Sequence, residues 1–227
     1  YKNFFRDSKI GFPRFKSKHH SRNSYTTNVV NGNILVESKR IRLPKLKWIV
    51  MKKHREPAEG LCLKSVTVSL EPSGKYFASL LYEGYSCENQ AAELDYSTAK
   101  ILGIDYAMQG MAVFSEKIET EEAGFFRKNE KRLAREQRKL SRCVRGSHNY
   151  ELQKKKIAKC HEKIRNQRRD YLHKLSRKIA DGYDAVAVED IDMKAMSQCL
   201  HFGKSVQDNG YGMFREMLDY KLVWKGK

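Results

Sequence analysis

Two carboxylate side chains stand at the ends of short apolar runs in this sequence. Asp105 follows Ile101–Ile104, and Glu189 follows Ala185–Val188. Each run predicts a short strand buried on both faces, where a carboxylate is costly unless it is paired or binds a metal. Mg²⁺ prefers such oxygen ligands, and two-metal phosphodiester cleavage uses ions bridged by carboxylates. Asp105 and Glu189 are therefore candidate metal ligands and catalytic residues of an enzyme that acts on nucleic acid.

Each carboxylate also has a structural interpretation. An Asp at a strand end commonly caps a turn or pairs with a nearby Lys, and Glu189 stands before Asp190-Ile191-Asp192, where a polar loop can begin. Two-metal sites generally need about three or four acidic ligands, so this pair is too small by itself. Their shared setting, at the ends of apolar strands separated by basic helices, favours a joint role.

The elements that must position this pair form an α/β pattern from residue 97 onward. Strands are expected at Ile101–Tyr106 and Met111–Ser115, with a short third strand near Phe125–Phe126. Helical spacing of apolar residues predicts long helices at Asn129–Val144 and Tyr150–Ala180. Because successive strands of a domain usually neighbour one another, the Glu189 strand is expected to lie parallel to the Asp105 strand. Both carboxylates would then meet at one edge of the sheet.

The preceding part of the chain has a β pattern. Asn31-Gly32-Asn33 is a strong hairpin turn, and Val66–Leu70 and Tyr76–Leu81 flank a second turn at Pro72-Ser73-Gly74. Several short antiparallel strands at this spacing indicate a small barrel, OB-like, or a sandwich. The acidic stretch 84–99 is the expected linker. The predicted fold class is α+β, with a β-barrel domain at 1–96 and an α/β domain at 97–227.

The charge of the chain indicates a polyanionic partner. Lys and Arg number 45 against 27 Asp and Glu, for a formal net charge of +18. Like charges along the second helix destabilise it in isolation, and a bound polyanion relieves that cost, although a charged helix is more often a solvated face. The basic segment at residues 1–23 fits phosphates and stacked bases, or else a loop anchored by its Phe residues. The residues expected to bind nucleic acid are Arg14, Lys16, Lys18, Arg22, Lys155, Lys159, Arg165, Arg168 and Arg169.

Other classes of site find little support in the sequence. No apolar run approaches the roughly 20 residues that span a membrane, so a membrane partner is not expected. The five cysteines include no C-x-x-C pair, and no H-E-x-x-H motif is present, which argues against zinc. There is also no Walker-type glycine loop.

The two acidic motifs resemble the first two RuvC motifs of the TnpB family, the transposon-encoded OrfB proteins. They are Gly103-Ile104-Asp105-Tyr106-Ala107 and Val186–Met196. Further stretches that resemble family segments in the same order are Gly11–Lys18, Ile41–Leu46, Leu133–Arg142, Asn166–Ser176 and Tyr211–Phe214. TnpB proteins are RNA-guided DNA nucleases related to compact type V CRISPR effectors.

This resemblance implies a wedge domain that grips guide RNA and a short target-adjacent DNA motif. It also implies a RuvC-type, RNase H-like nuclease domain whose first two acids are Asp105 and Glu189. Mg²⁺, guide RNA and double-stranded target DNA are the cofactor and partners that follow, in the cytoplasm of a prokaryote near the nucleoid. The guide would read sequence by base pairing while the protein holds backbone and shape.

The chain departs from the family pattern in two places. The third catalytic acid follows a C-x-x-C zinc ribbon in the family, and both are missing from this sequence, which we interpret as a partial chain. Zinc is expected only if the full-length protein has that ribbon. The helical segment that normally interrupts the N-terminal barrel is missing as well. The alternatives are a nuclease-dead, RNA-guided DNA-binding repressor and an RNase H-like transposase that needs no guide.

Overall fold

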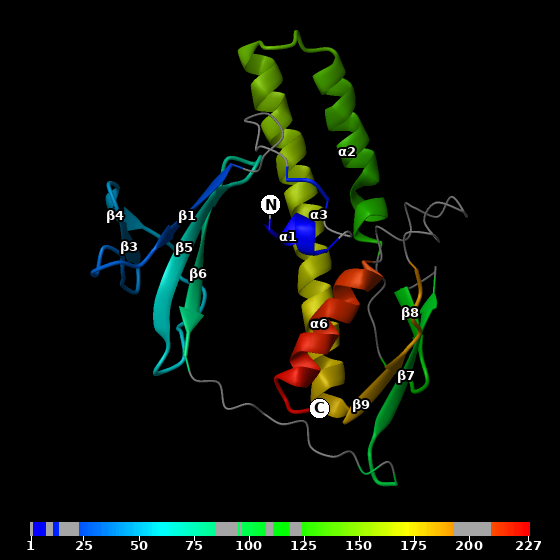
Figure 1. The fold of residues 1–227 in the computed structure, drawn as a ribbon. Coiled ribbons are helices and arrows are strands. Elements are labelled where there is room, and N and C mark those ends of the chain that lie inside the picture. Colours follow the sequence, from blue (N-terminus) through cyan, green and yellow to red (C-terminus); the bar gives the residue numbers. More distant parts are fainter. Residues whose placement is uncertain are drawn as a thin grey trace. The chain divides into compact units, whose positions relative to one another are not determined.

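The chain divides into two compact units, Tyr1–Tyr85 and Ser86–Lys227 (Figure 1). A computed structural model describes residues 2–7, 11–13, 23–84, 95, 97–107, 111–118, 124–192 and 210–227. The division after Tyr85 and the predicted boundary at 96/97 both fall in the predicted linker 84–99. The assignment of the two units as wedge-like and nuclease domains stays a prediction.

The first unit contains a short helix and two antiparallel sheets of three strands each. One sheet has the order β1-β5-β6 and the other the order β2-β3-β4. The elements are α1 (Lys2–Arg6), β1 (Ser24–Asn28), β2 (Leu35–Val36), β3 (Arg40–Leu43), β4 (Lys47–Val50), β5 (Cys62–Leu70) and β6 (Tyr76–Glu83). The sheets share an apolar core made by Ile34, Ile41, Leu43 and Val66.

The predicted β class and the hairpin across Pro72-Ser73-Gly74 are confirmed, since β5 and β6 pair there. The turn at Asn31–Asn33 also forms, but it is not a hairpin, because β1 pairs with β5 and β2 with β3. The closed barrel is wrong for the residues that the structure describes. Gly32 lies in the Asn31–Asn33 turn at a φ of 69°, the left-handed region that glycine adopts without steric cost. Neither three-stranded sheet closes on itself. Spacing and alternation predict strands and turns but do not decide how many strands one sheet contains, because that depends on contacts between distant segments.

Among its described residues, the second unit combines a mixed sheet with three helices. The sheet has the order β8-β7-β9, in which β7 and β8 are antiparallel and β7 and β9 are parallel. The elements are β7 (Ile101–Ala107), β8 (Met111–Phe114), α2 (Phe125–Ser141), α3 (His148–Gly182), β9 (Ala185–Val188) and α6 (Tyr211–Val223). The α+β class and the parallel pairing of the two acid-bearing strands are thus confirmed.

The short strand expected at Phe125–Phe126 is wrong, because these residues begin helix α2. Gly124 stands before them at a φ of 95° and starts the helix. The Phe125 ring packs against Tyr171 of α3 at 5.5 Å between centroids. Packing against α3 therefore overrides the β preference of two adjacent aromatic residues.

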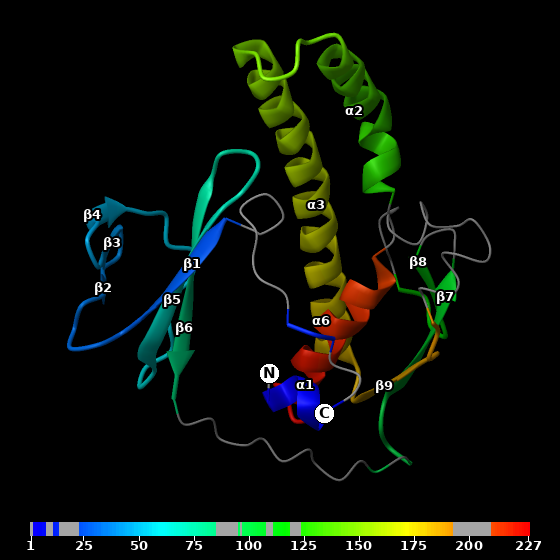
Figure 2. The same ribbon diagram turned by 45° about the horizontal axis from the view of Figure 1, so that its top comes forward.

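Helices α3 and α6 cover one face of this sheet (Figure 2). Leu102, Ile104 and Tyr106 alternate toward the helices and are buried with the apolar face of α3 and with Phe214 of α6. The opposite face is exposed in the described residues, with Ile101 at 41% and Val113 at 60% exposed. The expectation that these strands are buried on both faces is therefore wrong for the part described.

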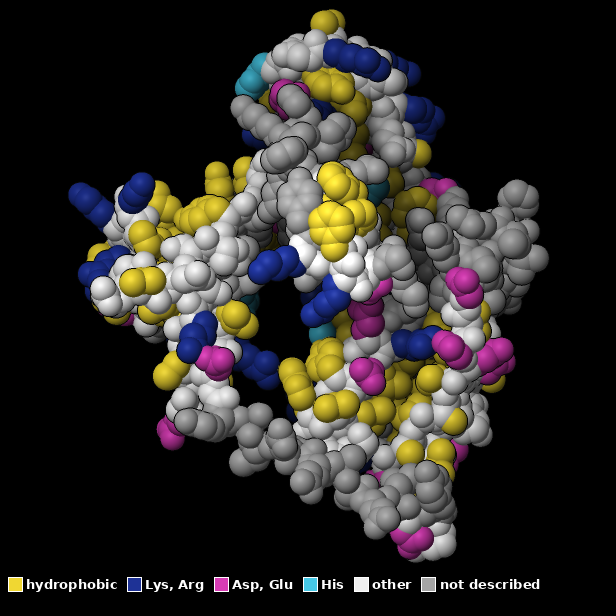
Figure 3. All heavy atoms as spheres, in the orientation of Figure 1, with side chains coloured by type: hydrophobic (Ala, Val, Ile, Leu, Met, Phe, Trp, Pro, Cys, Tyr) yellow, Lys and Arg dark blue, Asp and Glu magenta, His cyan; other side chains and the backbone are white. Residues whose placement is uncertain are grey.

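Helices α2 and α3 pack against each other as an antiparallel hairpin (Figure 1). Buried Gln153 ties the two together, donating from Nε2 to the backbone oxygen of Glu136 at 3.0 Å and to its Oε2 at 2.8 Å. This bond is the main cause that lowers the pKa of the Glu136 carboxyl. Figure 3 shows Lys and Arg side chains gathered over the loop end of the hairpin. None of the described helices is both long and apolar enough to cross a membrane.

Candidate active site

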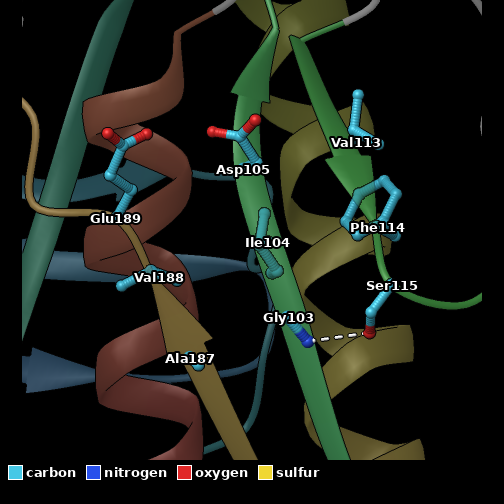
Figure 4. A pocket seen from close by; sticks show the side chains of 9 residues that line it. All are labelled: Gly103, Ile104, Asp105, Val113, Phe114, Ser115, Ala187, Val188 and Glu189. Atoms are coloured by element: carbon cyan, nitrogen blue, oxygen red, sulfur yellow. Dashed lines mark hydrogen bonds between the residues drawn. The ribbon is translucent and has the colours of Figure 1, made fainter.

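The strand register brings Asp105 and Glu189 to the same place. Parallel pairing sets Gly103 beside Ala187 and Ile104 beside Val188. The next residue of each chain segment is a carboxylate: Asp105 lies within β7, two residues before its end, and Glu189 directly follows β9. Figure 4 shows the two carboxyl groups on neighbouring strands, turned toward the same space. Two residues 84 positions apart in the sequence are thereby side by side.

An open pocket of about 420 Å³ lies along the exposed face of the sheet next to these carboxylates. Its lining is Gly103, Ile104, Asp105, Val113, Phe114, Ser115, Ala187, Val188 and Glu189. Gly103 donates its backbone N–H to Ser115 Oγ at 2.9 Å, which links β7 to the end of β8 (Figure 4). The small residues Gly103 and Ala187 leave room below the carboxyl groups, and the rest of the wall is mostly apolar.

The two carboxyl groups interact strongly. A hydrogen bond with Asp105, together with desolvation and repulsion between the two charges, raises the pKa of Glu189 above its ordinary value. A pair of acids this close is stabilised either by a shared proton or by a cation bound between them. The arrangement is chemically suited to hold a divalent cation.

Helix α6 adds groups that the sequence analysis did not assign to the site. Arg215 donates from its guanidinium to Asp190 Oδ1 at 3.1 Å, one residue beyond Glu189. Tyr211 is fully buried, its ring 5.1 Å from that of Tyr106, and both hydroxyl groups have no hydrogen-bond partner among the described residues. Burial raises the pKa of the Tyr211 hydroxyl, and the charges of Asp105 and Glu189 act in the same direction. No spacing signal in the sequence points to Arg215.

Comparison with known proteins identifies the family. Residues 84–200, just over half of the chain, match the OrfB_IS605 family, described as "Probable transposase". The chain belongs to this family. The resemblance to the transposon-encoded OrfB proteins is thus confirmed, and the matched span contains both Asp105 and Glu189.

Two curated relatives of this OrfB_IS605 chain match along its whole length. The "Putative RNA-guided DNA endonuclease InsQ" of Escherichia coli strain K12 is 33% identical over 241 residues, which cover 57% of that protein. A "Putative RNA-guided DNA endonuclease" of Streptomyces pristinaespiralis is 30% identical over 232 residues, which cover 54% of it. The chain therefore spans about half the length of the curated relatives it matches.

The donor atoms of the pair fit a hard cation such as Mg²⁺, although the pair is a partial ligand set. Both side chains offer carboxylate oxygens, which Mg²⁺ binds together with water and substrate phosphates. Among the described residues of this OrfB_IS605 chain, no group of three or more His, Cys, Asp and Glu side chains forms a metal site. Asp105 and Glu189 are therefore candidate ligands, and a complete metal site would need further ligands besides these two.

The predicted nucleic-acid residues do not line the pocket. Lys155, Lys159, Arg165 and Arg169 are exposed along α3, and half-buried Arg168 lies against Gly210 at the start of α6. Arg14, Lys16, Lys18 and Arg22 lie outside the described residues. Their contacts with nucleic acid remain predictions for this member of the OrfB_IS605 family.

Proposed function

We propose that this chain is part of an RNA-guided, Mg²⁺-dependent DNA endonuclease. The single observation that carries the proposal is the meeting of Asp105, within β7, and Glu189, directly after the parallel strand β9, beside an open pocket. Both curated relatives are named as RNA-guided DNA endonucleases, which supports this proposal. The proposal assigns the second unit to a RuvC-type, RNase H-like nuclease domain and the first unit to a wedge-like domain.

Asp105 and Glu189 would hold the metal ion through their carboxylate oxygens. When bound, Mg²⁺ supplies Lewis acidity toward a phosphodiester and lowers the pKa of bound water. The protein's own part is to hold the two carboxylates adjacent, and a bound cation would remove their mutual repulsion and favour the ionised form of both. The Arg215–Asp190 ion pair holds the segment that follows Glu189 against α6.

The basic surface of the second unit would hold nucleic acid by its backbone. Between residues 124 and 169, seventeen are Lys or Arg and four are Asp or Glu. A surface of this sign binds phosphates with little regard to sequence, which suits a protein whose sequence reading is done by a guide RNA. Lys155, Lys159, Arg165, Arg168 and Arg169 are the α3 residues proposed for this contact, and Arg14, Lys16, Lys18 and Arg22 those of the N-terminal segment.

The test is the replacement of Asp105 in the full-length protein. Asp105→Ala and the isosteric Asp105→Asn are expected to reduce Mg²⁺-dependent DNA cleavage to background, because a metal ligand is lost, and to leave RNA binding intact. Cleavage of a guide-matched plasmid and retention of labelled RNA on a filter are the two measurements. Asp219→Asn is the matched control, since this exposed carboxylate of α6 lies outside the pocket.

Two results would contradict the proposal. Full cleavage by Asp105→Asn would remove this residue from the metal site. Loss of cleavage in the control Asp219→Asn would show that any lost carboxylate in this unit disturbs the enzyme. If the unaltered protein binds guide-matched DNA but never cuts it, the nuclease-dead repressor replaces the endonuclease.

A further inference from the structure

The small sheet β2-β3-β4 has two faces of different chemistry. Antiparallel pairing sets Arg42 between Leu35 and Trp48, and sets Arg40 beside Val50. Side chains directly opposite each other share a face, so these five residues lie together on what we call the outer face. The intervening residues Ile41 and Leu43 are buried in the core of the first unit.

The outer face exposes large apolar groups that the core does not use. Trp48 is 38% exposed and Val50 86% exposed. The Arg40 guanidinium carbon lies 4.6 Å from the centre of the Trp48 ring and thereby steadies the indole. Arg40 also pairs with Glu37 at 2.6 Å, and Arg42 donates to the Gly32 carbonyl oxygen at 2.9 Å. Trp48 thus has Arg40 beside its ring, Arg40 is itself anchored by Glu37, and the indole still reaches solvent.

Positive charge surrounds this face. Residues 35–53 contain seven Lys and Arg against a single acidic residue, Glu37. The tight β3–β4 turn holds Lys45 and Lys47 at φ values of 65° and 53°, a left-handed conformation that costs a non-glycine residue free energy. Figure 3 shows Lys and Arg side chains among hydrophobic ones over the part of the first unit that carries β3 and β4. An exposed aromatic ring within a cationic surface is the chemistry that binds an unpaired base between phosphates.

We propose that the outer face of β2-β3-β4 is an RNA-binding platform on which an unpaired base stacks against Trp48 while Arg42, Lys45 and Lys47 contact the flanking phosphates. Duplex DNA keeps its bases inside the stack, whereas loops, bulges and ends of RNA present bases that aromatic side chains receive. The inference rests on the proposed function in one respect, that the protein carries an RNA. It names the surface of the first unit that holds part of that RNA.

Tryptophan fluorescence tests the stacking directly. The chain has two tryptophans, Trp48 and Trp224, so Trp224→Phe leaves Trp48 as its single tryptophan, and any tryptophan outside this chain is replaced by Phe as well. In that variant of the full-length protein freed of nucleic acid, a single-stranded RNA of about 12 nucleotides is expected to quench the emission on binding. A duplex of the same length binds by charge and should leave the emission nearly unchanged. Binding of the single strand without quenching would overturn the proposal.

Substitution of the ring gives an independent measurement. Trp48→Ala should weaken binding of the same RNA by between about 5-fold and about 150-fold, the loss of one base–aromatic stack, and Trp48→Phe should restore most of it. Tyr76→Ala is the control, because Tyr76 on β6 is also an exposed aromatic of the first unit, 72% exposed, and lies in the other sheet. Equal affinity of Trp48→Ala and the unaltered protein would overturn the platform.

Ultraviolet crosslinking of the purified complex identifies the nucleic acid at the site. A ribonucleotide attached to the tryptic peptide Trp48–Lys52 supports the proposal, and a deoxyribonucleotide there, or no adduct, overturns the assignment to RNA. None of these measurements depends on cleavage. Failure of the platform therefore leaves the metal site of Asp105 and Glu189 untouched, and an inactive Asp105→Asn variant still reports on Trp48.

Discussion

At the scale of single residues, the room beside the two carboxylates depends on small neighbours. Gly103 lies two residues before Asp105 on the same strand, so both project to the exposed face of the sheet. A Cβ atom at Gly103 would meet the Cβ of Ser115 at 3.4 Å, an ordinary contact distance. A β-carbon therefore fits at this position, and the absence of a side chain on Gly103 keeps the pocket open.

Gly103→Val is expected to lower DNA cleavage by about tenfold or more while changing the free energy of unfolding by less than about 1 kcal/mol. The branched side chain suits a strand but fills the pocket below Asp105 and Glu189. Thermal unfolding and a cleavage assay of the same preparation measure both quantities. Gly212→Val is the control, because a Cβ there meets open space. Unchanged cleavage by Gly103→Val would mean that the substrate does not enter this pocket.

At the scale of elements, the C-terminal end of α3 is tied to the sheet and to the end of the chain. Asp184, between α3 and β9, accepts the backbone N–H of Lys100 at 3.1 Å just before β7. Lys227 donates to the carbonyl oxygens of Ala180 at 3.2 Å and Tyr183 at 2.6 Å, where a cation also complements the helix dipole. These bonds fix the position at which β9 starts. The parallel register with β7 then sets the position of Glu189 beside Asp105.

Asp184 makes the stability of the second unit depend on pH in a defined direction. The hydrogen bond from the Lys100 backbone, and then the charge of Lys227, lower the pKa of Asp184 below its unfolded value. Its contribution is thus fully present above about pH 3.9 and is lost as the pH falls through the lower native pKa. Asp184→Asn should lower the melting temperature at about pH 7, and the difference from the unaltered protein should shrink toward about pH 3.

Circular dichroism melts of both proteins across this range measure the effect. Asp219→Asn removes an exposed carboxylate of α6. The difference in melting temperature between this variant and the unaltered protein should not change between about pH 7 and about pH 3. A melting difference for Asp184→Asn that is the same at both ends of the range would mean that the ionised form contributes nothing.

At the scale of the whole molecule, the dominant property is an excess of positive charge that lies on both units. The first unit carries it around the β3–β4 turn, and the second along the α2–α3 hairpin. Binding of a polyanion to such surfaces releases counterions, so its affinity falls steeply with salt. The net charge of +18 predicts this behaviour without any reference to the catalytic site.

Replacing Lys155, Lys159, Arg165 and Arg169 by Gln should reduce the slope of log affinity against log salt by up to about 3, because each phosphate contact on a single strand contributes about 0.7. Filter binding of one RNA over a salt series measures the slope. Lys174→Gln is the control on the same helix, since its ammonium is paired with Asp170 at 2.7 Å. An unaltered slope in the fourfold variant would place the bound phosphates away from α3.

Much of the second unit is predictable from sequence because its signals are local. Helical spacing locates α3, and the apolar runs locate β7 and β9. The start of α2 at Phe125 is not predictable in this way, because the aromatic pair favours a strand until the contact of Phe125 with Tyr171 is considered. In the first unit the turn at Gly32 is evident, whereas the division of six strands into two sheets depends on which distant edges pair.

The sequence by itself determined that Asp105 and Glu189 each follow a short apolar run, that the chain is a polycation, and that its motifs resemble one transposon family. Only the tertiary structure decided that the two carboxylates are adjacent beside an open pocket, that Arg215 ties down the segment after Glu189, and that Trp48 faces outward among arginines. The physical reason is the distance along the sequence over which each kind of interaction acts. Turns, periodicity and charge act over a few residues, whereas strand register and side-chain packing join segments 84 residues apart.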